Sequence, residues 1–253
     1  MNGLGVAVRV EVVKAWASPV VRITTALLLA GVTVLAAAMS WAADRGNEQV
    51  TAQLGPFAES SGWERYLGVA AQVVAAGGLL ALGVVLSWST GREFIDRTVS
   101  GLYALPVARP TIVCAKLIVH VAWSAVAGSL LVGALFAVGL ALGLGWPDPA
   151  AMAAQARIFV LLVLSSVLVV PAGWVVTVSR SLLAGVGTVV GIIVLAQVAV
   201  VAGGGAWLPF VAPALWAVEP AAVSPAQLAL GFVVPLAFGA GTVRAWAEME
   251  LDR

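Results

Sequence analysis

The amino-acid sequence predicts an all-α membrane protein with six transmembrane helices. The chain has 253 residues, of which 62% are hydrophobic and only 10% are charged. A soluble domain carries about 25% charged residues, so this composition could not cover a surface in water. Several apolar stretches also reach the ~20 residues that a helix needs to cross a ~30 Å hydrocarbon core. These observations predict a single transmembrane domain over residues 1–253.

Apolar stretches predict where the chain crosses the membrane. The first of them, "ITTALLLAGVTVLAAAMSWAA", contains no charged residue. The third is longer than a perpendicular crossing needs, which predicts a tilt or an extension out of the bilayer. No linker or change of composition marks a second domain. The expected spans are 23–43, 66–88, 117–145, 158–178, 182–205 and 227–247.

A short amphipathic segment precedes the first span. Residues 4–18, "LGVAVRVEVVKAWAS", combine valines with scattered charges, and Pro19 ends the pattern. A lone strand would have no partner beside a membrane, whereas an interfacial helix could anchor itself through Trp16. We therefore expect an N-terminal interfacial helix.

Segment 206–223, "AWLPFVAPALWAVEPAAV", is apolar enough to resemble a seventh span. Pro209, Pro213 and Pro220 would break a helix there, and Glu219 would be costly in lipid. We expect instead a re-entrant or interfacial hairpin on the outer face, before the sixth span.

The placement of basic residues predicts the orientation. With both termini in the cytoplasm, only Arg45, Arg65 and Arg157 of the 13 Lys and Arg residues fall outside. Such an excess of Lys and Arg on one side marks the cytoplasmic side. The sequence therefore predicts a multi-pass protein of the cytoplasmic membrane with both termini inside.

A dense charged segment, "GREFIDRTVSGLYALPVARPTIVCAKL" (91–117), then lies in the cytoplasm between spans two and three. A helix from Arg92 to about Tyr103 would be amphipathic. Its apolar face would hold Ile95, Thr98, Val99 and Leu102, and its polar face Arg92, Glu93, Asp96, Arg97 and Ser100. The simpler alternative is a solvated loop that only fixes orientation. The mixture of acids and bases and the apolar stripe favour a helix that covers either headgroups or another protein.

Catalytic and nucleotide-binding motifs are missing from the sequence. A phosphate-binding Gly-x-x-x-x-Gly-Lys loop needs a lysine after glycine, and the only lysines, Lys14 and Lys116, follow Val13 and Ala115. A zinc site needs clustered ligands, but there is one histidine, His120, and one cysteine, Cys114. The scattered charges suggest no nucleic-acid partner. We therefore expect no catalytic residue, metal or cofactor in this chain.

The charged segment resembles the cytoplasmic loop of ABC-2 type permeases, the membrane subunits of many bacterial ATP-binding-cassette exporters. The resemblance rests on Arg92–Glu93, Leu105–Pro106–Val107, Arg109 and Ala115–Lys116–Leu117. It extends to the six spans, the N-terminal helix and the outer hairpin. It implies a coupling helix at residues 92–104 that contacts a separate ATPase, which would hold ATP and Mg²⁺. The implied contact residues are Arg92, Glu93, Ile95, Asp96, Arg97, Val99 and Leu102.

The resemblance also implies how cargo would cross the membrane. Such permeases act as dimers of identical or different subunits, with spans two and five lining a central cavity. Gln72 and Gln197 would then form a polar part of the pathway, with His120 as a further candidate. The alternative is that each hydrogen-bonds a neighbouring helix. The implied function is export of a small amphipathic compound such as a drug, antibiotic or peptide.

Two other functions stay open. An ion-coupled carrier usually buries ionisable groups within its spans, whereas here Arg22, Lys116 and Arg244 lie near inner ends, where they could reach the headgroups. The second alternative is a membrane anchor or assembly factor of the same fold that moves no cargo.

Overall fold

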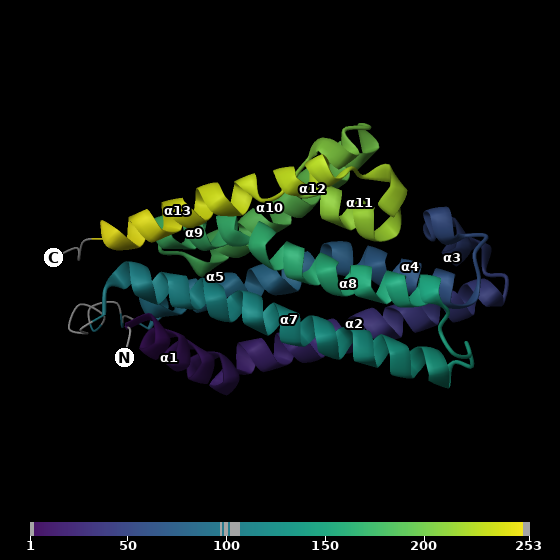
Figure 1. Cartoon of the computed structure of the whole chain (residues 1–253), viewed down its shortest axis with the longest axis horizontal. Coiled ribbons are helices and arrows are strands. Elements are labelled where there is room, and N and C mark those ends of the chain that lie inside the picture. Colours follow the sequence, from purple (N-terminus) through teal and green to yellow (C-terminus); the bar gives the residue numbers. More distant parts are fainter. Residues whose placement is uncertain (1–2, 97, 99–100, 102–106, 250–253) are drawn as a thin grey trace.

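The structure, a computed structural model, describes residues 3–96, 98, 101 and 107–249. Within these residues every regular element is a helix. The predicted all-helical architecture is therefore confirmed. Figure 1 shows long helices side by side along one axis, with α1 (Gly3–Ala17) and the end of α13 (Val233–Ala247) at the same end of the bundle. We call this end the terminal end and the opposite end the far end.

Six helical segments among the described residues are long and apolar enough to cross a membrane. Each overlaps one of the six predicted ranges, although the fifth ends at Val201 rather than at 205. The segments are Pro19–Asp44 (α2), Gly62–Ile95 (α4 to α5), Arg109–Ala141 (α7), Pro149–Ser179 (α8 to α9), Leu182–Val201 (α10) and Pro225–Ala247 (α12 to α13).

Three of the six segments are interrupted inside their length, the sixth of them at Gly231 and Phe232, between α12 and α13. The second consists of α4 (Gly62–Val73), a π-helical turn η2 (Val74–Gly78) and α5 (Leu79–Ile95). The fourth divides into α8 (Pro149–Leu168) and α9 (Val170–Ser179), just before Pro171. A proline inside a helix removes one backbone hydrogen bond and clashes with the preceding turn, which explains this second break.

The N-terminal segment forms the helix expected from its sequence. It packs against α7, burying Ala7 and Glu11 and leaving Trp16 85% exposed. It ends because Ser18 caps the next helix, where the Val21 N–H donates to Ser18 Oγ at 3.3 Å, and Pro19 takes the first position of α2. The position of α1 at a membrane interface stays a prediction.

Short helices cover the far end of the bundle. They are α3 (Glu48–Gln53), η1 (Gly55–Phe57), η3 (Gly205–Trp207), α11 (Ala212–Val218), η4 (Pro220–Ala222) and α12 (Pro225–Leu230). Segment 206–223 thus forms short turns rather than a seventh span. Its α11 packs against α8 and α4 and buries Ala212, Pro213 and Ala217. Whether this segment re-enters the bilayer stays a prediction.

The charged segment begins inside the second span rather than with a separate helix at Arg92. Residues 92–95 are the last turn of α5, a direct continuation of the second span, and Asp96 caps that helix. The expected coupling helix continues over residues 97, 99–100 and 102–104, which lie outside the described residues.

One apolar cluster fills the bundle along α2, α4, α5, α7 and α8. Tyr66, Leu82, Leu131 and Leu162 are fully buried within it. At the terminal end a second, smaller cluster joins Ile112 and Val113 of α7 to Trp246 of α13.

Candidate functional site

The structure places the described members of the predicted ATPase contact in two environments. Ile95 is 59% exposed and Asp96 is also exposed, whereas Arg92 is half-buried with its guanidinium over the Trp88 ring. Glu93, expected on the polar outer face, is 3% exposed and points into the bundle. That placement of Glu93 was wrong, because residues 92–95 continue the buried face of α5. Arg97, Val99 and Leu102 lie outside the described residues.

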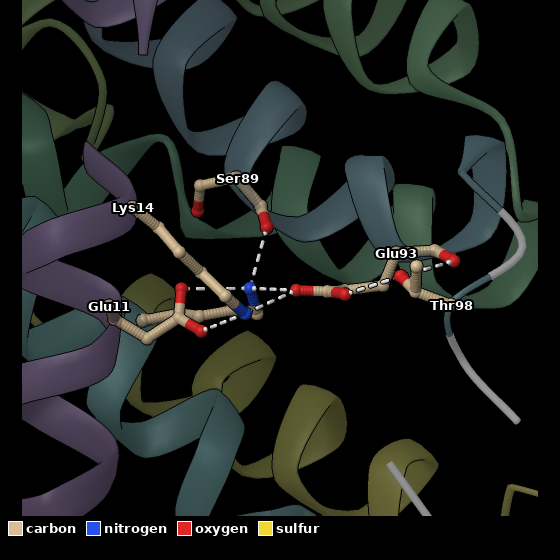
Figure 2. A network of polar contacts seen from close by, with 6 residues as sticks. Glu11, Lys14, Ser89, Glu93 and Thr98 are labelled. Carbon is tan, nitrogen blue, oxygen red and sulfur yellow. Dashed lines mark hydrogen bonds and ion pairs between the residues drawn. The ribbon is translucent and has the colours of Figure 1, made fainter. Parts of the chain in front are cut away.

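Glu93 belongs to a buried network of four charges. Its Oε1 accepts from Lys14 Nζ at 2.9 Å and from Lys116 Nζ at 3.1 Å. Glu11 closes the network, with Oε1 at 2.8 Å from Lys14 Nζ and Oε2 at 2.9 Å from Lys116 Nζ. Figure 2 shows Glu11 and Lys14 reaching from α1 toward Glu93 on α5. Each carboxylate thus contacts both ammonium groups. We call Glu11, Lys14, Glu93 and Lys116 the ion network.

Lys116 is the most buried member, with its side chain 1% exposed. An ammonium group has three donors, and here they reach Glu11, Glu93 and the Ser89 carbonyl, the last at 2.9 Å. The expectation that Lys116 extends to the headgroups was therefore wrong. Burial of a charge is costly unless it is paired and hydrogen-bonded, and the network meets both conditions with two positive and two negative charges.

Three separate elements bring these side chains together. Glu11 and Lys14 are three residues apart on α1 and so share one face of that helix. That face packs on α7, which carries Lys116, while Glu93 comes from the last turn of α5. Thr98 extends the network into the charged segment, because its Oγ1 donates to Glu93 Oε2 at 2.8 Å. The ion network therefore joins α1, α5 and α7 at the base of that segment.

Electrostatics keep the outermost member charged. Burial alone would lower the pKa of Lys14, but hydrogen bonds and charge attraction from Glu11 and Glu93 raise that pKa above its ordinary 10.5. Lys14 is therefore an ammonium ion at any physiological pH. Such paired charges hold the helices that carry them together.

Further polar contacts fasten the last span to the same end. Trp246 Nε1 donates to Thr177 Oγ1 of α9 at 3.1 Å, and the Trp246 ring meets the Phe94 ring edge-on. Arg109, at the start of α7, donates to the carbonyls of Ala247 (3.0 Å) and Met249. The two carbonyls lie at the last residue of α13 and two residues beyond it, where backbone carbonyls have no partner within the helix. Movement of the charged segment would therefore act on α5, α7 and α13 together.

The structure does not bring the three predicted pathway residues together. Gln72 is partly buried in α4 and donates to the carbonyl of Leu54, the C-cap residue of α3, at 3.3 Å. Gln197 is exposed on α10, one turn before the helix ends at Val201. His120 is buried in α7, and the Ser166 backbone faces it without a hydrogen bond of normal geometry. Their role in a pathway stays a prediction.

Two members of the ion network, Glu11 and Lys14, were missed by sequence reasoning. The sequence signal that could have drawn attention to Lys14 is that the chain has only two lysines. In the structure, both lysines contact the same two glutamates. Within the part of the chain that the structure describes, no group of three or more His, Cys, Asp or Glu side chains could hold a metal ion.

At the far end, a cavity of about 500 Å³ opens between α4, α8 and α11. Aromatic rings of Phe57, Trp63 and Trp146 line it, together with the charged residues Glu64, Asp148 and Arg157. Arg157 Nε donates to the Ala217 carbonyl at 3.4 Å. A cavity of this size and mixed lining suits one small amphipathic molecule.

Comparison with known proteins identifies the family. No curated protein matches the chain at a significant level. The family model described as "ABC-2 family transporter protein" matches residues 7–197, which is well over half of the chain. The matched range includes the ion network, the charged segment and the first four spans entirely. Together with the six candidate spans, this match confirms the resemblance, and the chain belongs to the ABC-2 family of transporter proteins.

Proposed function

We propose that this chain is the permease subunit of an ATP-binding-cassette exporter, driven by a separate ATPase at the terminal end of the bundle. The observation that supports this most directly is the ion network beneath the charged segment. A force that the ATPase exerts on that segment would be transmitted to α1, α5 and α7 by these ion pairs. The family match and the excess of Lys and Arg at this end agree with a cytoplasmic ATPase.

We further propose that the permease works as a dimer. Gln197 supports this, because it is exposed on α10 between apolar residues such as Val194 and Val198. An amide facing hydrocarbon is costly, so contact with a second permease subunit, identical or different, is the more favourable surrounding. Membrane lipids would cover the remaining apolar faces.

The proposed cargo is a small amphipathic compound. The far-end cavity supports this, since it combines aromatic walls with both signs of charge. In the proposed orientation it opens on the outer side, where an exported compound would leave. Drug-like, antibiotic and peptide cargoes all fit this description.

An ion-coupled carrier is less well supported. Coupling to protons or sodium needs a carboxylate that can exchange its partner within the membrane. The two buried glutamates, Glu11 and Glu93, are each held by two lysines. Energy from a partner subunit therefore fits better than an ion gradient.

The test is copurification from mild detergent of the tagged full chain. Wild type is compared with Ile95→Asp plus Asp96→Arg, which changes two exposed residues at the end of α5, and with Glu48→Arg at the far end as the matched control. We expect a nucleotide-hydrolysing subunit to copurify with wild type and with the control, and to be lost from the double variant. If no such subunit copurifies with wild type, the anchor and carrier alternatives replace the exporter.

A further inference from the structure

The far-end cavity carries its charged residues at two depths. It lies between α4, α8 and α11, which contact one another at the far end of the bundle (Figure 1). Helices α4 and α8 both begin at this end, so residues later in either helix lie deeper. Glu64 in the first turn of α4 and Asp148 at the start of α8 are exposed, and they mark the outer level. Arg157 follows Asp148 by nine residues, or ~13.5 Å of helix rise, and marks the inner level.

The walls between the two levels are apolar and leave room for a ligand. The lining face of α8 before Arg157 consists of small side chains, Ala150, Ala151 and Ala154. On the other side, the Phe57 ring lies directly on α4, because a Cβ at Gly68 would meet this ring at 2.4 Å. The space is therefore bounded by alanines and aromatic rings, and it suits an apolar or aromatic body between two polar ends.

Arg157 lacks an anionic partner at the inner level. It is half-buried, and its Nε donates to the Ala217 carbonyl at 3.4 Å. Within the described part of the chain, Arg157 makes no ion pair and no second hydrogen bond. A guanidinium group has five N–H donors, so four remain for another group. An arginine inside a membrane-spanning segment is costly unless it is paired. A carboxylate is the partner whose two oxygens match these donors.

The outer level favours a cation instead. Glu64 contacts no cationic side chain among the described residues, and Asp148 uses one oxygen to accept from the Ala151 N–H at 2.7 Å. The Trp146 ring, 78% exposed, lines the same level, and the face of an indole ring attracts an ammonium group. A simple anion would be repelled here, and a simple cation would leave Arg157 unpaired. A ligand with a charge of each sign at its two ends satisfies both levels.

We propose that the far-end cavity binds a short linear peptide with free termini. Its carboxylate pairs with Arg157, its ammonium group lies beside Glu64 and Asp148, and its side chains lie between the rings of Phe57 and Trp63. An extended peptide of about three residues covers ~10 Å. This length fits the two levels, because the Arg157 side chain leans back toward the start of α8.

A zwitterionic phospholipid head group carries the same two charges in a different arrangement. Its phosphate and ammonium groups are joined by an ethylene linker, so they lie too close together to reach both levels. The proposal narrows the cargo class and rests on the proposed export function for that role alone. Binding itself is measured without ATP or a partner subunit.

Isothermal titration calorimetry of the full chain in a neutral maltoside detergent tests the site. The probe is the tripeptide Ala-Phe-Ala with free termini, compared with its C-terminal amide and its N-acetyl derivative. We expect saturable binding of the free peptide to wild type. The amide should bind at least about tenfold more weakly, because it loses a charged hydrogen bond at the half-buried Arg157. The N-acetyl peptide should bind about threefold more weakly, because its lost partners are exposed.

Two variants assign these preferences to single residues. Arg157→Met should bind the free peptide and the amide equally, while it still binds the N-acetyl peptide more weakly than the free peptide. Glu64→Gln, a change of an exposed side chain, should reduce the preference over the N-acetyl peptide and keep the preference over the amide. Arg244→Met and Glu48→Gln remove the same charges outside the cavity and should keep both preferences.

Three results would overturn the proposal. The first is the absence of saturable peptide binding to wild type. The second is an Arg157→Met variant that binds all three peptides more weakly by the same factor, since that would indicate a structural role alone. The third is displacement of the peptide by an equal concentration of dihexanoyl phosphatidylethanolamine, which would assign the cavity to a lipid head group. The export function is tested separately by copurification of the ATPase, so its failure is distinguishable from each of these.

Discussion

Lys116 shows how strongly a single buried charge can depend on its partners. Its side chain is 1% exposed, and its three donors are all engaged. Lys116→Met keeps the length of the side chain but leaves two glutamates with one lysine. Removing one partner of a buried ion pair costs about 3–5 kcal/mol, so we expect a clear fall in the Tm of the detergent-solubilised protein.

Two further variants separate lost charge balance from lost packing. Lys116→Met combined with Glu93→Gln restores neutrality and should recover part of the lost Tm. Arg244→Met removes an ion pair with Glu248 in which both side chains are more than half exposed, and it should cost at most about 1 kcal/mol. If Lys116→Met is no more harmful than Arg244→Met, the ion network contributes little to stability.

The raised pKa of Lys14 predicts a loss of stability only at alkaline pH. A lysine whose pKa is higher in the folded than in the unfolded state stabilises the fold fully below its unfolded pKa. This contribution is lost as pH rises from 10.5 through the raised folded value. Lys14→Arg should resist this loss, because a guanidinium stays charged above pH 12. Parallel Tm profiles of wild type and Lys14→Arg between pH 7 and about 11.5 would refute the prediction.

At the scale of single residues, the sequence showed which side chains are charged but not which side chains they contact. Glu93 and Lys116 were recognised as charges, yet they were expected at a solvated surface and at the headgroups. Their burial depends on α1 folding back over α7, an arrangement of elements distant in sequence. The periodicity of apolar residues within one helix could not predict this packing. The apolar stripe of α1 is imperfect, and the orientation of Glu93 follows from its place in the last turn of α5 rather than in a separate helix.

The elements themselves were predicted more accurately than their irregularities. Length and hydropathy suffice to predict a transmembrane helix, because a helix needs about 20 apolar residues to cross a membrane. The π-helical turn at Val74–Gly78 has the same apolar composition as the helices around it, so the sequence did not predict it. Helix glycines differ in how closely neighbouring side chains approach them. A Cβ at Gly139 would lie 2.2 Å from the Trp63 ring, whereas Gly187 and Gly191 meet nothing within 4 Å in this chain.

Helices α5 and α10 pack closely at Gly83 of α5. A Cβ at Gly83 would lie 2.3 Å from Val189 Cγ2, so Gly83→Ala should separate the two helices and lower Tm, at a cost of about 1–3 kcal/mol. Gly133→Ala on α7, where the space is open, should be neutral or stabilising by up to about 1 kcal/mol because alanine favours the helix. Combining Gly83→Ala with Val189→Ala should restore part of the Tm. Equal effects of the two glycine changes would contradict the close packing of α5 on α10.

At the scale of the whole molecule, function depends on which end of the bundle faces the cytoplasm. The ion network, the charged segment and the end of α13 all lie at the terminal end, and the cavity of about 500 Å³ lies at the far end. In the proposed function, the ATPase acts on the protein from the terminal end. The positive-inside pattern predicts that this end is cytoplasmic, and the far-end cavity then opens outside.

Labelling of single cysteines in intact cells can decide the orientation. In a Cys114→Ala background, Glu48→Cys marks the far end and Ser179→Cys the terminal end, and both positions are exposed. We expect a membrane-impermeant maleimide to label Glu48→Cys in intact cells and Ser179→Cys only after permeabilisation. The positions lie at opposite ends of the bundle, so each serves as the control for the other. If only Ser179→Cys were labelled in intact cells, the terminal end would face outward. The charged segment would then lie outside the cell, where no cytoplasmic ATPase could contact it.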